Sequence, residues 1–338
     1  MLHVRLLVPV DLTVQVLALL DGNVGVVNVS VVAGAGRSPV GDLIEFDAAR
    51  EVGDELFAAL TDLGLDDRGA IAVEQVDLSL CRSSREAQER VPGNSTDAVI
   101  WDEVETRTGD DAALTATFLT FLTIATLLAG VGIVTDSAVT VVGAMVVGPE
   151  FGPLAAIAVG LVRRRGRLAR RGAIALAVGF PVAMAITAFA TWVAQETGLV
   201  NDDLVELNTQ TEFIYTPGWL SLVVALLAGA AGMLSLTSRN SAALVGVFIS
   251  VTTVPAAGYV AVGGVLGEWS QVWGSALQLL INLVGIVLAA SAMLWTRRLA
   301  HGRRLRRSAV AGQTARHFDG TKRLPGLLSG IKPETQRE

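Results

Sequence analysis

Charged residues are rare in the second part of the chain, where long apolar stretches follow one another from Asp111 onward. A membrane-spanning helix needs about 20 mostly apolar residues. Six stretches meet this requirement: residues 112–135, 137–162, 172–195, 213–238, 240–267 and 269–296. Only the second stretch contains an ionisable residue, Glu150. The pattern predicts an all-α polytopic membrane domain of six helices over residues 112–297.

The first 80 residues show a different pattern, in which alternating apolar positions give way repeatedly to helical spacing. The strand-like stretches are LHVRLLV, VGVVNVSVV, GDLIEFDA and GAIAVEQVDL, and the helical ones are DLTVQVLALLDG and AREVGDELFAALTDLGL. Five apolar residues share one face of the second helix: Val52, Leu56, Ala59, Leu60 and Leu63. The β-α-β-β-α-β order predicts an α+β domain of the ferredoxin-like type over residues 1–80.

Composition and charge support this division into two environments. The chain is 51% hydrophobic and 17% charged, which is typical of a membrane protein. Residues 1–111 carry 21 Asp and Glu against 8 Lys and Arg, whereas the remainder carries 11 against 18. The polar residues 81–111 are expected to link the two domains, and residues 298–338 to form a basic, partly disordered tail.

Arginines predict the orientation, because short cytoplasmic connections are enriched in Lys and Arg. Six arginines lie in residues 163–171, Arg239 lies in the fourth connection, and six more follow the last span within residues 297–307. The other connections carry only acidic charges. Both termini and the acidic N-terminal domain are therefore expected in the cytoplasm, with the chain in the bacterial cytoplasmic (inner) membrane. Asp11 precedes any apolar core of signal length, so no cleaved signal peptide is expected.

The second apolar stretch contains Pro149, Glu150 and Pro153, which are costly inside a membrane helix. Proline removes a hydrogen-bond donor, and an ionisable side chain in hydrocarbon is by default a candidate functional residue. The stretch is therefore expected to be a broken helix.

The two groups of three spans show an internal repeat. The matching segments are Leu127–Gly130 with Leu226–Gly229, Val142–Val147 with Val245–Ser250, and Pro153 with Pro255. Because each unit has three crossings, the second unit enters from the opposite face, which predicts a 3+3 inverted repeat with broken second and fifth helices. The breaks and the polar face of the sixth helix supply the candidate substrate- or ion-binding residues: Gly148, Pro149, Glu150, Gly152, Pro153, Ser250, Thr252, Thr253, Pro255, Gln278 and Asn282.

Ser275, Gln278 and Asn282 are spaced three and four apart and share a face of the sixth helix. Two interpretations stay open for them, a lined pathway or interhelical hydrogen bonds that only hold the bundle together.

Other chemistry is not favoured by the sequence. The single Cys81 and three scattered histidines form no metal cluster, so neither a metal nor another cofactor is expected. The glycine-rich segment 34–39 lies between two strands and lacks the helix that a phosphate loop requires. Glu150 has no nucleophile or histidine near it in sequence, so an enzyme is not expected.

Five stretches resemble a known family: GAMVVGPEFGPL, FPVAMA, AGMLSLTSRNSAALVG, ISVTTVPAA and QLLINLVGIVLA. They are similar to the bacterial and archaeal membrane proteins of domain-of-unknown-function 389 (DUF389). The N-terminal part resembles a cytoplasmic domain that many members carry, so the likeness covers residues 1–298. The resemblance implies an architecture but no activity. Many members have Ser-Pro followed by Leu or Met where this chain has Gly148, Pro149 and Glu150.

We therefore expect a transporter or ion-conducting protein with its site at the broken helices and a regulatory or oligomerising N-terminal domain. Its expected partners are the lipid bilayer, further copies of itself, and a small solute, monovalent cation or proton, and nucleic acid is not expected among them. The alternative is a non-transporting membrane sensor or scaffold whose soluble domain binds a ligand or partner. A water-accessible cavity around Glu150 would favour transport, and a dry interior would favour the scaffold.

Overall fold

The structure is a computed structural model that describes residues 1–76, 78–91, 99–200, 211–216, 218–238 and 252–319. The chain divides into two compact units, and the boundary between Met293 and Leu294 falls inside the last helix. All the elements discussed below belong to the first unit unless stated otherwise.

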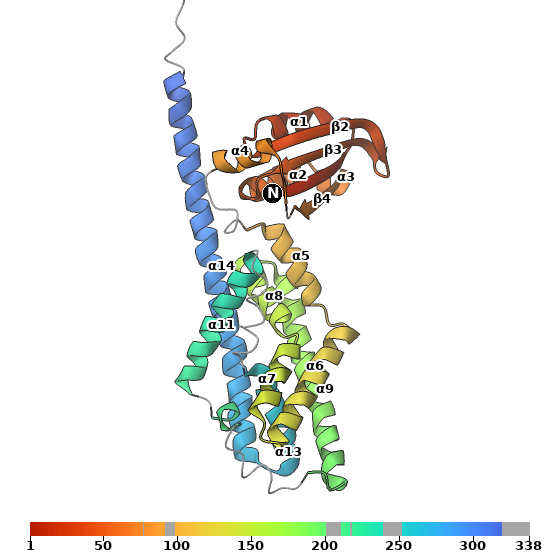
Figure 1. The fold of residues 1–338 in the computed structure, drawn as a ribbon, viewed down its shortest axis with the longest axis vertical. Coiled ribbons are helices and arrows are strands. Elements are labelled where there is room, and N and C mark those ends of the chain that lie inside the picture. Colours follow the sequence, from red (N-terminus) through yellow and green to blue (C-terminus); the bar gives the residue numbers. More distant parts are fainter. Residues whose placement is uncertain (77, 92–98, 201–210, 217, 239–251, 320–338) are drawn as a thin grey trace, which may run out of the picture. The chain divides into compact units, whose positions relative to one another are not determined.

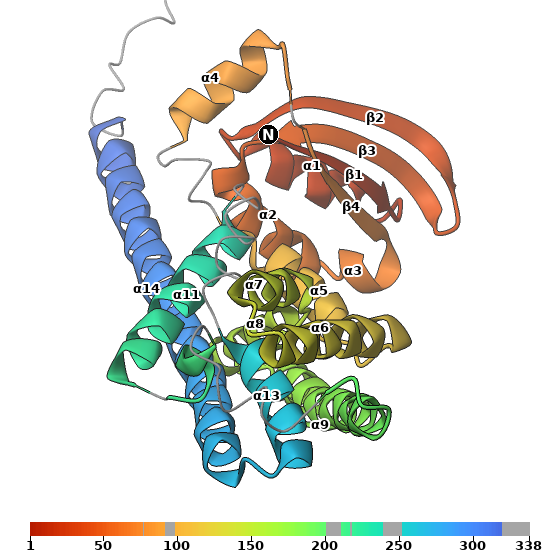
Figure 2. The ribbon, with the colours of Figure 1, turned by 60° about the horizontal axis from the view of Figure 1, so that its bottom comes forward.

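The N-terminal part is a small four-stranded antiparallel sheet with helices (Figures 1 and 2). Its elements are β1 (Leu2–Val8), α1 (Thr13–Asp21), β2 (Val26–Arg37), β3 (Val40–Ala48), α2 (Arg50–Asp62), α3 (Leu65–Arg68) and β4 (Ala70–Gln75). The strand order is β2-β3-β1-β4, and every neighbouring pair is antiparallel. The predicted β-α-β-β-α-β order is therefore present, with α3 as an additional short helix.

Alternation along β1 explains how the sheet is covered. Leu2, Val4 and Leu6 are buried in a core shared with helices α1 and α2, which lie against one face of the sheet (Figure 2). The residues between them point to the opposite face, where His3 pairs in register with Asp47 and Arg5 with Glu45. Successive side chains of a strand alternate between faces, so an apolar-polar alternation gives one packed and one open face.

Two helices occupy most of the described part of the polar segment 81–111, namely α4 (Arg82–Arg90) and α5 (Trp101–Asp111). We expected a linker over these residues and no helices, because the sequence there has little apolar periodicity. In α5 only Trp101, Val104 and Thr108 are buried, and these residues are three and four positions apart.

The remaining elements are helices. The predicted second span is divided into two helices, and the described helix in the predicted fifth span is short. They are α6 (Ala116–Val134), α7 (Ala138–Val147), α8 (Phe151–Val162), α9 (Gly166–Glu196), η1 (Glu212–Ile214), α11 (Trp219–Thr237), α13 (Thr253–Leu266) and α14 (Trp269–Asp319). Four of the described helices are long and apolar enough to cross a membrane, and the bent pair α7 and α8 gives a fifth if the two helices form one span. These helices suggest a bilayer environment and a multi-pass membrane protein.

The count of six spans stays a prediction. Helix α13 has 14 residues and is too short to cross by itself, while residues 239–251, in the first half of the predicted fifth span, lie outside the described part of the chain. Helix α14 continues to Asp319, so the described residues of the predicted tail are helical and belong to the second unit from Leu294 onward.

Small residues allow helices to approach closely. A Cβ atom on Gly258 of α13 would lie 2.8 Å from the Cβ atom of Ala129 in α6. A Cβ atom on Gly229 of α11 would lie 2.5 Å from the carbonyl oxygen of Ile286 in α14. Because contacts this short exclude any side chain, these glycines allow α13 to pack closely on α6 and α11 on α14.

Candidate functional site

The predicted break in the second span is present. Helix α7 ends at Val147, α8 begins at Phe151, and the two axes are bent by 51°. Pro153 is the third residue of α8, where an amide hydrogen would have no partner within the helix. Pro153 therefore costs the helix little stability at this position. Glu150 is the residue directly before α8.

Helix α13 begins in the same manner. Its first residue is Thr253, Thr252 precedes it, and Pro255 is again the third residue. The N-termini of α8 and α13 thus share a proline at one position but differ in the residue before the helix, which is a carboxylate in one and a hydroxyl in the other. The candidate Ser250 lies outside the described residues.

Glu150 joins the two helix starts. Its side chain is buried, with 7% exposed, and the Thr253 hydroxyl donates a hydrogen bond of 2.6 Å to Oε1. The other carboxylate oxygen, Oε2, is buried and has no hydrogen-bond partner among the described residues. Gly148 allows this fold-back, because a Cβ atom there would lie 2.3 Å from Glu150 Oε2. The sequence placed Glu150 and Thr253 in one candidate site through the repeat, and in the structure the two side chains are in direct contact.

The polar face of α14 contacts Thr252, the residue directly before α13. Ser275, Gln278 and Asn282 are all at most 2% exposed. The amide nitrogens of Gln278 and Asn282 donate to Thr252 Oγ1 at 3.3 and 3.0 Å. These bonds hold α14 against α13, as the bundle interpretation requires, but Ser275 Oγ and Gln278 Oε1 remain buried without a partner among the described residues.

Not every candidate faces the carboxylate. A Cβ atom on Gly152 would lie 2.6 Å from the Cβ atom of Asp111 at the end of α5, so Gly152 permits close packing of α5 on α8. Burial raises the pKa of Asp111 above its ordinary value. Pro149 is half-buried in the connection, whereas Pro153 and Pro255 are buried in their helices.

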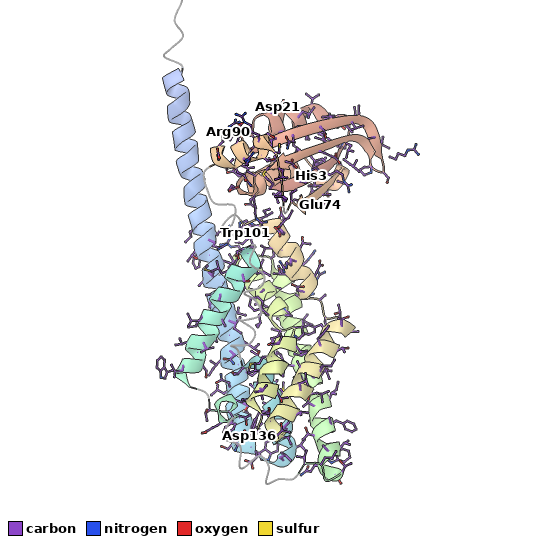
Figure 3. All side chains as sticks on the ribbon, viewed as in Figure 1. His3, Asp21, Glu74, Arg90, Trp101 and Asp136 are labelled. Carbon is purple, nitrogen blue, oxygen red and sulfur yellow. The ribbon has the colours of Figure 1, made fainter. Side chains whose placement is uncertain are left out.

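Helix α5 supplies contacts that the sequence did not reveal. Glu105 accepts a hydrogen bond of 2.7 Å from Arg163 Nε and lies 3.3 Å from Arg165 Nε, in the connection after α8. Trp101, labelled at the start of α5 in Figure 3, has its ring centroid 5.3 Å from the Arg163 guanidinium. At least two arginines of the run at 163–171 therefore have specific protein partners, beyond the topology signal expected for the run.

The same helix contacts the sheet domain. Glu103 accepts 2.9 and 2.8 Å bonds from Arg50 of α2 and Gln75 of β4. Trp101 is buried as well, with 4% exposed, so its side chain packs on protein. One helix of 11 residues thus touches both the sheet domain and the helix that begins beside Glu150.

A second polar cluster lies on the open face and edge of the sheet. Asp47 accepts bonds from Asn28 at 2.7 Å and contacts His3 at 2.9 Å, and Ser83 donates to Asn28 at 2.8 Å (His3 is labelled in Figure 3). The Ser83 hydroxyl, 2.7 Å from Cys81 Sγ, and the Ser84 amide lower the pKa of the Cys81 thiol to about 7. These groups partner one another, and no sequence motif had indicated them.

The side chains around Glu150 present oxygen atoms, which are the ligands that hard cations prefer. In the described part of the chain no three His, Cys, Asp or Glu side chains come together as they would around a multi-carboxylate metal. The site consists of one carboxylate, hydroxyls and amides, gathered at two helix ends and one helix face.

The family model described as "Domain of unknown function (DUF389)" matches residues 145–288. All of the candidate site residues lie within this range, and the N-terminal sheet lies outside it. No curated protein and no solved structure matches the chain.

Proposed function

We propose that this chain, which belongs to the DUF389 family through residues 145–288, is a membrane transporter or ion-conducting protein whose site lies at the α7–α8 break and the start of α13. Glu150 is its central residue, as a cation or proton site. The N-terminal sheet domain regulates the site or holds subunits together.

One observation carries the proposal. A carboxylate is buried at a break between two apolar helices, accepts a hydrogen bond from a hydroxyl of a third helix, and has one oxygen without a partner among the described residues. Buried charges in proteins are normally paired or fully hydrogen-bonded, because desolvation is costly. An ionisable group within membrane helices that lacks such pairing is typical of ion and proton pathways.

The shared helix starts support the inverted repeat. Pro153 and Pro255 occupy the third position of α8 and α13, and the residues before these helices meet through the Glu150–Thr253 contact. In transporters with inverted repeats, substrate sites form where the discontinuous helices of the two halves meet. We propose that residues 240–267 form the second broken span of six.

We propose that both termini and the sheet domain lie in the cytoplasm, in a bacterial inner membrane. The arginines of residues 163–171 follow α8. The contact of Arg163 with Glu105 supports their placement on the same side of the membrane as helix α5. The turn after α6 carries Asp136 (labelled in Figure 3), which accepts bonds from Thr211 of the next acidic connection. This separation of charge follows the positive-inside rule.

A regulatory role for the sheet domain is supported by helix α5. Glu103 ties α5 to α2 and β4, Glu105 ties it to Arg163, and Asp111 packs on Gly152, two residues from Glu150. A shift of the sheet domain would therefore move the first turn of α8. Such a chain of contacts is a physical route by which a ligand of the sheet domain changes the site.

An assembling role is supported by strand β2, which is an edge of the sheet. Val29, Val31 and Val32 are 39 to 53% exposed on it. Exposed edge strands with apolar side chains pair readily with another strand, so we propose that copies of the chain form a homo-oligomer through this edge.

Ion flux in liposomes tests the proposal. We expect the purified full-length protein to carry protons or monovalent cations across the bilayer, and Glu150→Gln to bring the flux to that of empty liposomes. Glu196→Gln, at the exposed end of α9, is the matched control and should keep the wild-type rate. Flux that is equal in wild type and Glu150→Gln would remove the carboxylate from the mechanism.

The alternative is a membrane sensor or scaffold that transports nothing. The bonds from Gln278 and Asn282 to Thr252 favour it, because they hold helices together as in a static bundle. Under this alternative, Glu150→Gln would lower the melting temperature of the protein, while wild-type liposomes would carry no more ions than empty ones.

A further inference from the structure

Two buried acceptor oxygens near the break have no hydrogen-bond donor among the described residues. Gln278 uses both amide hydrogens, toward Thr252 Oγ1 at 3.3 Å and Asn282 Oδ1 at 3.2 Å. Thr253 gives its hydroxyl hydrogen to Glu150 Oε1. What remains is Gln278 Oε1 and Glu150 Oε2, both of which are buried acceptors without a donor among the described residues.

Ser275 contributes a third oxygen of this kind. It precedes Gln278 by three residues on α14, so both lie on one helix face, and its hydroxyl is fully buried without a partner in the described part of the chain. A buried polar atom without a partner is unfavourable, because it loses its bonds to water and gains none in the protein. Glu150 and Gln278 are linked through the adjacent residues Thr253 and Thr252, and Ser275 lies on the same helix face as Gln278, so these three oxygens are candidate ligands of one ion.

The charges indicate a ligand with a single positive charge. Glu150 is the carboxylate of this cluster, and the described residues show no ion pair between it and a Lys, Arg or His. Oxygen ligands suit hard cations, whereas the multi-carboxylate sets typical of Ca²⁺ do not occur among the described residues. One carboxylate balances one charge.

The helix ends favour a cation over an anion. The last carbonyl groups of α7 have no partner within that helix and form its negative end. The starts of α8 and α13 would attract an anion through their free amides, but Pro153 and Pro255 each remove one of these donors. The Glu150 carboxylate beside them repels an anion further.

We propose that this site binds one partly dehydrated monovalent cation, such as Na⁺, through oxygens of Glu150, Ser275 and Gln278. The inference rests on the proposed function, because it names the class of substrate that the same site takes. Residues Thr252 and Thr253 join its two sides, since one bonds Gln278 and the other Glu150. A proton on Glu150 would add a single donor and leave another buried acceptor unpaired.

Equilibrium binding of radioactive Na⁺ to the purified full-length protein tests the inference. We expect saturable binding of one ion per chain that an equal concentration of Ca²⁺ does not displace and that weakens at acid pH, because protons compete for the carboxylate. Ser275→Ala and Gln278→Leu should each weaken binding about tenfold, as the loss of one partner commonly does at ion sites. Glu150→Gln should abolish it.

Thr191→Val is the matched control. Thr191 is buried in α9, where its hydroxyl donates to the Thr187 carbonyl, so the variant also removes a buried hydroxyl but should keep wild-type Na⁺ binding. Binding that is equal in Ser275→Ala, Gln278→Leu and Thr191→Val overturns the inference, provided that all elute as folded protein.

Binding and flux separate the two proposals. Flux that depends on Glu150 without any Na⁺ binding overturns the cation site and keeps the transport function. Na⁺ binding that depends on Glu150 without flux of any ion overturns the transport function and keeps the cation site.

Discussion

Buried polar side chains are treated differently in the two parts of this protein. In the sheet domain, Asp42 is 8% exposed and its two oxygens accept bonds from Thr13 at 2.6 Å and Gly34 at 2.8 Å. In the helical part, Glu150 is 7% exposed, but among the described residues only one of its oxygens is bonded. This unequal pairing supports a structural role for Asp42 and is the basis of the ligand site proposed at Glu150.

After Glu150 itself, the largest effect on flux is expected from its partner, Thr253. Thr253→Val removes the hydroxyl that donates to Oε1, and hydrogen bonds to charged groups contribute about 1.5–3 kcal/mol. We expect ion flux to fall about tenfold or more, since 1.4 kcal/mol is a factor of ten. Liposome flux measures this, with Thr253→Ser as the variant that keeps a hydroxyl and should keep most of the rate. Equal flux in Thr253→Val and Thr253→Ser would contradict the role of this bond.

A smaller effect is expected where the two parts are joined. Glu105→Gln weakens the contacts of α5 with Arg163 and Arg165. The Glu105 side chain is 18% exposed. We expect the free energy of unfolding to change by about 1 kcal/mol or less, because partly exposed ion pairs contribute little. Flux should still change a few-fold, since α5 packs on the first turn of α8.

Glu86→Gln is the matched control, because Glu86 in α4 also pairs with two arginines, Arg82 and Arg90. If Glu105→Gln and Glu86→Gln have the same flux as wild type, α5 does not couple the sheet domain to the site.

The smallest effect on flux is expected from replacing Asp42, although this residue stabilises the sheet. The Thr13 hydroxyl and then the Gly34 amide hold the pKa of Asp42 below its ordinary value of 3.8. Because the native pKa is lowered, the stabilisation is fully present above pH 3.8 and is lost as the pH falls through the native pKa.

Asp42→Asn should therefore speed hydrogen exchange of the β3 amides at neutral pH. It should also reduce the difference in the protection of these amides between neutral and acid pH, and it should leave ion flux unchanged. Hydrogen exchange of the full-length protein measures the first effect. A wild-type exchange profile at both pH values would show that Asp42 contributes nothing to the sheet.

Local patterns allowed much of this fold to be predicted. Alternation along Leu2–Val8 follows directly from the two faces of a strand, and the break at Pro149 and Glu150 follows from the chemistry of proline and charge. The shared face of Ser275, Gln278 and Asn282 follows from helical spacing, and all three are buried as expected of a polar helix face turned inward.

Contacts between distant segments were harder to predict. The bond between Glu150 and Thr253 spans 103 positions, and only the repeat suggested that these residues belong together. Helix α5 escaped prediction because its packing depends on ion pairs, such as Glu105 with Arg163, which leave no periodic apolar signal. The unpaired oxygens depend on where each hydrogen bond is directed, which no sequence pattern specifies.

The most direct test of an ion site at the helix break is a high-resolution experimental structure of the protein in lipid, prepared in Na⁺ buffer. We expect density for an ion within roughly 2.3–2.6 Å of Glu150 Oε2, a distance typical of hard cations and oxygen, with Gln278 Oε1 among its neighbours. The density should be absent when Glu150 is replaced by Gln. Glu150 Oε2 paired with an arginine, or packed against apolar side chains without density beside it, would contradict the account.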